Sequence, residues 1–293
     1  MSRLADRYEL RHVVGRGGMG RVWAARDVHS GRDVAVKTAE AVRGGTGALR
    51  REAALAASVD HPGVVEVHDA GHDGDMDYLV MDLLSGPDLA AVLEDGPVPP
   101  AEALRIVHDL ADALAAVHDA GVVHGDVKPA NVVLTDDAVV LVDFGVAAAS
   151  PSCAGPVTFG TAPYMAPEQV ASAPATGASD VYALGCLLTA TLAGRPPFTA
   201  DSPTEILHRH VRAAAPRLRE LVLDVPPSLD ELGAAMLHKE PNGRCSAAEV
   251  RDVLADMRGE VKLPHRPLRP VGNMVSRPEP DATRPILELS PAV

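Results

Sequence analysis

Residues 124–145 begin with His124-Gly125-Asp126-Val127-Lys128-Pro129-Ala130-Asn131 and end with Asp143-Phe144-Gly145. Between these two motifs, apolar runs at 132–134 and 138–142 flank an Asp-Asp turn, which predicts a short β-hairpin. A hairpin brings its two ends together, so Asp126, Lys128 and Asn131 are expected close to Asp143. Each of these is an ordinary turn residue when taken alone. Together they offer two carboxylates, one amide and one ammonium, which suits a metal-bound polyphosphate held beside a hydroxyl nucleophile.

The composition is that of a soluble globular protein. Of the 293 residues, 46% are hydrophobic and 23% are charged, which allows one large or two small domains. The net charge of -13 argues against nonspecific nucleic-acid binding, because phosphate neutralisation needs an excess of Lys and Arg. Three widely spaced cysteines, Cys153, Cys186 and Cys245, fit a reducing compartment. We see neither a signal peptide nor an uninterrupted apolar run of about 18 residues. We therefore expect a cytoplasmic protein without a membrane span.

A glycine-rich segment lies between the first two of three predicted strands, at 8–14, 22–26 and 33–37. It reads Gly15-Arg16-Gly17-Gly18-Met19-Gly20-Arg21-Val22. Glycines lack Cβ and reach positive φ, so backbone N–H groups can approach phosphate oxygens closely. The pattern alone is weak, and a mobile surface loop fits it equally well. However, this segment leads from strand to strand, whereas a dinucleotide-binding fingerprint leads from a strand to a helix.

The third predicted strand places Ala35 and Lys37 on one face, because side chains alternate with period two. Ala35 is small, so it leaves space on the face that it shares with Lys37. A lone lysine at a strand end is usually a solvated charge, but Glu52, in a predicted helix at 48–58, is a candidate partner. Strands predicted at 64–68 and 78–84 complete a small β-rich lobe, and residues 85–87 break the pattern.

The remainder of the chain is predicted to be mainly helical. Apolar positions at three- and four-residue steps indicate a long helix at 100–120 that Gly121 ends. Residues 146–156 are small and are expected to be mobile. Further helices are predicted from Asp180 to about 193 and near 202–213, 228–238 and 246–257. Residues 259–293 are proline-rich with mixed charges, which predicts a mostly disordered tail.

These motifs resemble those of the serine/threonine protein kinases, and they are most similar to the eukaryotic-type (Hanks-type) kinases of actinobacteria. The likeness covers about residues 8–258 and includes the catalytic loop, Asp143-Phe144-Gly145, the glycine-rich segment closed by Val22, and Ala166-Pro167-Glu168. It implies an α+β, bilobal protein-kinase-like fold. Residues 1–84 would form a small, mostly β lobe with one main helix, 85–258 a larger α-rich lobe, and 259–293 the tail.

The resemblance also assigns roles to individual residues. The catalytic group would be Asp126, Lys128, Lys37 and Glu52. Those that bind ATP would be Val14, Gly15, Arg16, Gly17, Gly18, Met19, Gly20, Val22, Ala35, Lys37, Met81, Asp82, Leu84 and Val133, with Met81 as gatekeeper and 82–84 as hinge. Asn131 and Asp143 would bind Mg²⁺, with Mn²⁺ as an alternative. Thr158 and Thr161 would belong to the activation segment, and Glu168, Asp180 and Arg244 would be structural.

The implied reaction is transfer of the γ-phosphate of ATP to serine or threonine hydroxyls of proteins, with autophosphorylation. Lys128, two residues after Asp126, favours serine and threonine over tyrosine. One position departs from the family pattern, because Gly125 replaces the usual Arg. This departure leads us to expect a weaker dependence on activation-segment phosphorylation.

Two other functions are compatible with parts of the pattern. One is a pseudokinase that serves as an ATP-binding scaffold, although no expected metal or phosphate ligand is missing. The other is a small-molecule kinase, which should lack Ala166-Pro167-Glu168 and Gly160-Thr161. Pairing of two chains through their small lobes is expected by analogy only.

Overall fold

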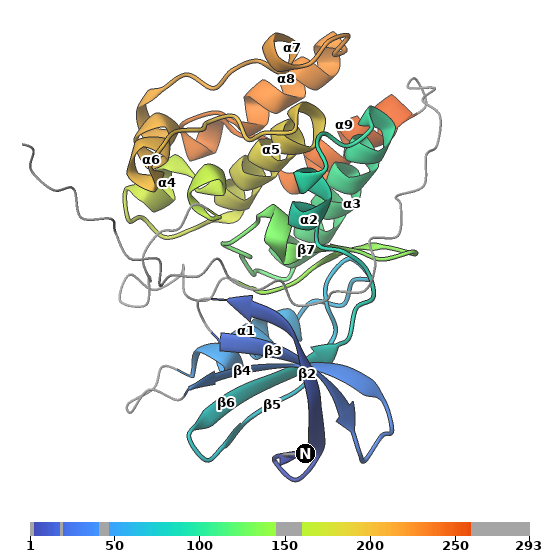
Figure 1. Ribbon diagram of the computed structural model, residues 1–293. Coiled ribbons are helices and arrows are strands. Elements are labelled where there is room, and N and C mark those ends of the chain that lie inside the picture. The colour runs from blue at the N-terminus through green and yellow to red at the C-terminus, as the bar shows by residue number, and fades with distance from the viewer. Residues whose placement is uncertain (1–2, 18–19, 41–46, 145–159, 259–293) are drawn as a thin grey trace, which may run out of the picture.

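The computed structural model describes residues 3–17, 20–40, 47–144 and 160–258. Several predictions fall outside the described residues: Gly18 and Met19 of the glycine-rich segment, Gly145, the segment 146–159 with Thr158, and the tail 259–293. The molecule has a β-rich lobe that contains the N-terminus and a larger helical lobe (Figure 1). The expected α+β, bilobal arrangement is confirmed.

The small lobe is built on one antiparallel sheet of six strands in the order β1-β2-β3-β4-β6-β5. The strands are β1 (Arg3–Leu4), β2 (Tyr8–Gly17), β3 (Gly20–Asp27), β4 (Asp33–Glu40), β5 (Val67–Asp73) and β6 (Met76–Asp82). Helix α1 (Ala48–Ala56) packs against β5 and β6 through Leu49, Ala53 and Leu79. The glycine-rich segment joins two neighbouring antiparallel strands, as predicted.

Strand β4 is buried on both faces from Val34 to Thr38, a stretch that begins with three apolar residues and ends with Lys37 and Thr38. On one face, Val34 and Val36 pack with Tyr8, Tyr78 and Val80. On the other face, Ala35 packs with Met81, Val65 and Val140. Because successive side chains of a strand point to opposite faces, this one strand contributes to both cores. Lys37 belongs to the Ala35 face.

The helical lobe surrounds α3 (Pro100–Asp119) and α5 (Gly177–Ala193), which pack against each other. The other helices are α2 (Leu89–Glu94), α4 (Pro167–Val170), α6 (Pro203–Arg212), α7 (Leu218–Leu221), α8 (Pro227–Met236) and α9 (Ala247–Arg258). Leucines such as Leu110, Leu114 and Leu187 are completely buried in its core, which contains few aromatic residues. The left-handed Gly121 (φ 73°) follows α3, in agreement with the predicted helix end.

The predicted hairpin consists of β7 (Val132–Leu134) and β8 (Val139–Leu141), with Asp136 and Asp137 exposed in the turn. Its turn end is fixed to the linker between the lobes, because Leu134 N, at the end of β7, donates to Pro87 O at 2.9 Å. Gly86 (φ 146°) approaches this strand so closely that a Cβ would lie 2.0 Å from Leu134 O. Only glycine fits there.

Two predicted strands, at 64–68 and 78–84, are displaced in the structure. Val64 and Val65 do not lie in the six-stranded sheet but pair with the hairpin, where Val65 N donates to Leu141 O at 3.1 Å. Strand β5 therefore begins at Val67. Strand β6 begins two residues earlier than predicted, because a turn with Gly74 in the left-handed region connects it to β5.

Within the described ranges, no helix combines the length and apolar character needed to cross a membrane. Cys186 and Cys245 are free thiols, the first buried in α5 and the second half-buried before α9. Burial raises the pKa of the Cys245 thiol above its usual range. Neither cysteine lies among the predicted site residues.

Candidate active site

Lys37 joins the two lobes through its ammonium group. Its Nζ contacts both carboxylate oxygens of Glu52 from α1, at 2.8 and 3.0 Å, and Asp143 Oδ1 after the hairpin, at 3.1 Å. Burial disfavours the ammonium, but the carboxylates of Asp143 and Glu52 outweigh this effect and raise the pKa of Lys37. For Glu52, burial dominates over the attraction of Lys37 and raises the pKa to about 7. The predicted pair is therefore formed, and Asp143 shares its cation.

Asp126 lies in a second polar cluster with Lys128 and Asn131. Lys128 Nζ contacts Asp126 Oδ2 at 2.6 Å and Thr161 Oγ1 at 3.2 Å. Asn131 Nδ2 donates to the backbone carbonyl of Asp126 at 2.8 Å and to Oδ2 at 3.1 Å. Among the described residues, the side chains of Lys128 and Asn131 thus both donate to Oδ2 of Asp126. Through Lys128, the loop that carries Asp126 also contacts Thr161.

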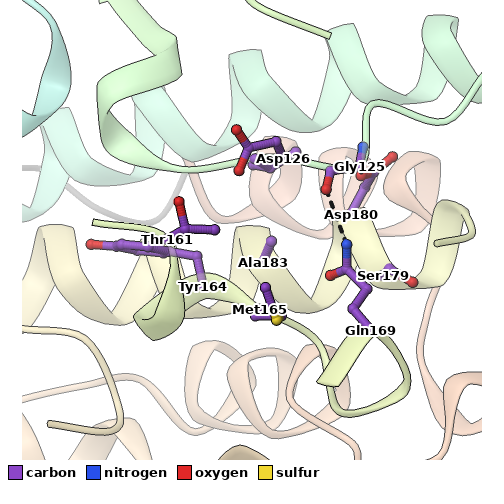
Figure 2. Close-up of a pocket in the computed structure, with 10 residues that line it drawn as sticks. Gly125, Asp126, Thr161, Tyr164, Met165, Gln169, Ser179, Asp180 and Ala183 are labelled. Atoms are coloured by element: carbon purple, nitrogen blue, oxygen red, sulfur yellow. Dashed lines mark hydrogen bonds between the residues drawn. The ribbon is translucent and has the colours of Figure 1, made fainter. Parts of the chain in front are cut away.

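Asp180 at the start of α5 holds the backbone of the catalytic loop. Its Oδ2 accepts from His124 N at 2.9 Å and its Oδ1 from Gly125 N at 2.8 Å. His118 Nε2 lies 2.9 Å from the same Oδ2. Figure 2 shows Asp180 beside Gly125, and Asp126 and Thr161 are among the residues that line a cavity of about 50 Å³. A buried carboxylate with this many donors fixes the loop.

Some of the residues predicted to bind ATP, together with Val140, which was not predicted, form an apolar cluster between the lobes. Ala35, Met81 and Val140 are buried together, with Val22 and Leu84 half-buried against them. Val133 lies on β7 opposite Val140 and is not in this cluster. Asp82 ends β6, and its Oδ1 lies 2.7 Å from His68 Nε2.

The described part of the glycine-rich segment lies at the adjoining ends of β2 and β3. Val14 occupies a bulge of β2, between Val13 and Gly15. Gly15, Arg16 and Gly17 follow it on β2, while Gly20 and Val22 begin β3. Gly20 has φ 139°, a conformation that L side chains rarely adopt.

Glu168 and Arg244 form the predicted pair within the helical lobe. Arg244 Nη1 contacts Glu168 Oε1 at 2.7 Å and Nη2 contacts Oε2 at 2.8 Å, a bidentate geometry. The Ser179 hydroxyl also donates to Oε1, at 2.7 Å. Burial opposes ionisation of Glu168, but the hydrogen bonds from Arg244 and Ser179 prevail and lower its pKa.

Three positioning residues were not among the sequence candidates. Gln169 Nε2 donates to Gly125 O at 3.0 Å, and its Oε1 accepts from Ala166 N at 3.1 Å (Figure 2). Ser179 supports Glu168, and buried His124 lies 3.1 Å from Val142 O through its Nε2. Of the three, only His124 could have been found from the sequence, because it is the first residue of the motif at 124–131. Gln169 and Ser179 are ordinary helix-start residues in the sequence.

The side chains of Asn131 and Asp143 suit a hard divalent cation. Both offer oxygen ligands, which Mg²⁺ and Mn²⁺ prefer. Asn131 is buried and is held by Asp126, whereas Asp143 is one-third exposed with φ 59°. The donor set therefore fits the metal that the sequence implies.

A model of the protein kinase domain matches residues 8–253. The chain belongs to the protein kinase family, whose members use ATP and a divalent metal ion. It is 40% identical to the serine/threonine-protein kinase PknB of Mycolicibacterium smegmatis over 85% of its length, and 37% identical to a probable serine/threonine-protein kinase of Corynebacterium efficiens over 94%. The chain covers 42% and 43% of these relatives.

A solved structure agrees with this assignment. The PknI kinase domain of Mycobacterium tuberculosis matches with a TM-score of 0.69 and 29% identity, covering 87% of this chain and 96% of that domain. The expected resemblance to actinobacterial serine/threonine kinases is thus confirmed.

Proposed function

We propose that this chain transfers the γ-phosphate of ATP to serine and threonine hydroxyls of proteins, including its own. The single observation that best supports this is the assembly of Lys37, Glu52 and Asp143 at the junction of the lobes. In protein kinases the corresponding lysine–glutamate pair and metal-binding aspartate must both be in place for transfer.

In this proposal Asp126 orients the acceptor hydroxyl and takes its proton, and Lys128 neutralises charge on the transferring group. Lys37, held by Glu52, binds the α and β phosphates. Asn131 and Asp143 hold magnesium, which would supply further charge neutralisation. Positioning and charge neutralisation provide most of the acceleration in such a reaction. The contact of Thr161 with Lys128 supports a peptide platform beside Asp126.

The decisive experiment incubates the purified chain with Mg-ATP and a generic protein substrate and then maps the phosphorylated residues. Asp126→Asn and Lys37→Met should each abolish phosphorylation while the circular-dichroism spectrum stays unchanged. Asp137→Asn, in the exposed hairpin turn, is the matched control and should retain full activity. Unchanged activity in Asp126→Asn or in Lys37→Met would refute the role of the substituted residue.

The same assay separates the alternatives. A pseudokinase scaffold would bind ATP without producing phosphoprotein, and a small-molecule kinase would not modify serine or threonine. Replacing Mg²⁺ by Mn²⁺ tests the preferred metal. Sedimentation of the active chain tests the proposed homodimer, and the need for ATP supports our proposal of a cytoplasmic location.

A further inference from the structure

The small-lobe sheet carries a chain of side-chain hydrogen bonds that reaches the strand leaving the glycine-rich segment. Trp23 Nε1 donates to Thr38 Oγ1 at 3.2 Å, and the Thr38 hydroxyl donates to the backbone carbonyl of Arg21 at 3.3 Å. Thr38 is 3% exposed, so its hydroxyl depends on protein partners rather than on water. Strand β4 is thereby tied to the residue that follows the last glycine of the motif.

The backbone reinforces this connection at the same place. Arg21 lies opposite Thr38 in the ladder between β3 and β4, and Val22 lies opposite Lys37. A Cβ on Gly20 would lie 1.9 Å from Thr38 O, so the glycine backbone passes directly over that carbonyl. Thr38 therefore contacts the start of β3 through both its side chain and its main chain.

The hydrogen-bond chain lies on the sheet face opposite Lys37. Because side chains alternate along β4, Thr38 shares a face with Val36, which packs with Tyr78 and Val80. Lys37 projects from the other face toward Glu52 and Asp143. Trp23 and Thr38 thus have no side-chain contact with a nucleotide at Lys37 and act on it through the backbones of β3 and β4.

We propose that Trp23 and Thr38 are positioning residues that set the height of the backbone at 20–22 above the phosphates of bound ATP. The inference rests on the proposed function, since it requires ATP at Lys37. Backbone N–H groups bind phosphate oxygens only within hydrogen-bond distance, so a small displacement of this strand weakens phosphate binding. The adenine surface consists mainly of Ala35 and Met81, which take no part in this chain of hydrogen bonds, and only its Val22 belongs to residues 20–22.

Thr38→Val tests the proposal, because it removes the hydroxyl and keeps the β-branched shape. Calorimetry should show Mg-ATP affinity reduced about three- to tenfold, the range for one lost hydrogen bond between backbone and phosphate, with adenosine affinity reduced by less than about twofold. The KM for ATP should rise in parallel, while kcat at saturating ATP changes by less than about twofold. Thr38→Ser, which retains the hydroxyl, should restore ATP affinity.

Trp23→Phe removes only the first donor and should weaken ATP binding in the same direction, so it carries the test if Thr38→Val does not fold. Thr189→Val is the matched control. It deletes another buried hydroxyl, which donates to Gly185 O at 3.0 Å within α5, and it should leave both affinities unchanged.

Equal weakening of ATP and adenosine binding in Thr38→Val, or no weakening of either, would overturn the proposal. A chain that binds Mg-ATP but phosphorylates nothing would refute the kinase function, and the comparison of ATP and adenosine affinities would still test the role of Trp23 and Thr38. A chain that binds neither nucleotide nor adenosine would overturn both.

Discussion

Two buried ion pairs, Lys37–Glu52 and Arg244–Glu168, are similarly shielded from solvent but differ in how their charges are satisfied. The side chains are 7% and 3% exposed in the first pair and 0% and 11% in the second. Arg244 donates to Glu168 and also to three backbone carbonyls, those of Ala178, His238 and Lys239. Lys37 instead has two carboxylate partners, Glu52 and Asp143.

The difference explains the opposite pKa shifts of the two glutamates. Glu168 accepts from a guanidinium and a hydroxyl, which hold its charge and lower its pKa. Among the described residues, Glu52 accepts side-chain hydrogen bonds from Lys37 alone, so burial prevails and raises its pKa to about 7. A saturated pair holds the fold, whereas an incompletely satisfied pair can reorganise around an anionic ligand.

The largest effect is expected from breaking the saturated pair. Arg244→Met removes the guanidinium from the Glu168 carboxylate, which keeps only the Ser179 hydroxyl, and from three carbonyls, which should lower the free energy of unfolding by about 3–5 kcal/mol. Urea denaturation measures it. Arg209→Met, which breaks the exposed pair with Glu205, is the control and should change stability by less than about 1 kcal/mol. A loss from Arg244→Met no greater than that of the control would contradict the contrast.

The second prediction uses pH to separate the two pairs. Glu52 must be ionised to hold Lys37, so kcat/KM for ATP should fall about tenfold per pH unit below about 7. Between its ordinary pKa of 4.5 and about 7, Glu52 binds more protons folded than unfolded, so acidification in this window removes no stability through this group. Glu168 has a lowered pKa, and its contribution is lost only below 4.5.

A pH profile of kcat/KM measures the fall in activity below about pH 7, and thermal unfolding at each pH measures the stability. Glu52→Gln should be less active, and its kcat/KM should no longer fall below about pH 7. If the fall persists in Glu52→Gln, another group causes it.

The third prediction concerns stability after removal of Lys37. Near pH 7, Glu52 can take up a proton at little further cost because its pKa is already about 7. Lys37→Met should therefore lower the free energy of unfolding by only about 1 kcal/mol, although activity is lost. The same denaturation experiment that tests Arg244→Met measures it. A loss as large as that of Arg244→Met would show that the two pairs are equivalent in the fold.

The sequence predicted the partners in both ion pairs, but it did not predict the opposite pKa shifts of the two glutamates. Lys37, Glu52, Glu168 and Arg244 were found because motif order constrains which side chains meet. The pKa of Glu52 depends on which donors surround it, and Ser179 beside Glu168 carries no motif.

The displaced strands have a similar cause. Apolar residues at 64–65 predict a strand equally well whether they pair with the main sheet or, as the structure shows, with Leu141 of the hairpin. The Trp23–Thr38 hydrogen bond depends on the register of β3 and β4, which local patterns do not specify.

The smallest effect is expected at Gly125, which joins the catalytic loop to the helical lobe without a side chain. Its N–H donates to Asp180 and its carbonyl accepts from Gln169, while its φ of 79° favours glycine. A kinase with Arg at this position can pair that guanidinium with a phosphorylated activation segment and so order it. Here residue 125 contributes only backbone groups, which the side chains of Asp180 and Gln169 bind, so a phosphorylated segment has no arginine at 125 to engage.

Thr158→Ala, or phosphatase treatment of the unaltered chain, should therefore change the initial rate by less than about threefold. Thr158→Ser, which retains a phosphorylatable hydroxyl, is the matched control. Phosphosite mapping before and after phosphatase treatment establishes that the modification was removed. A loss of orders of magnitude in both treatments would mean that another cation replaces the missing arginine, and the basic residues near the catalytic loop would then be the ones to substitute.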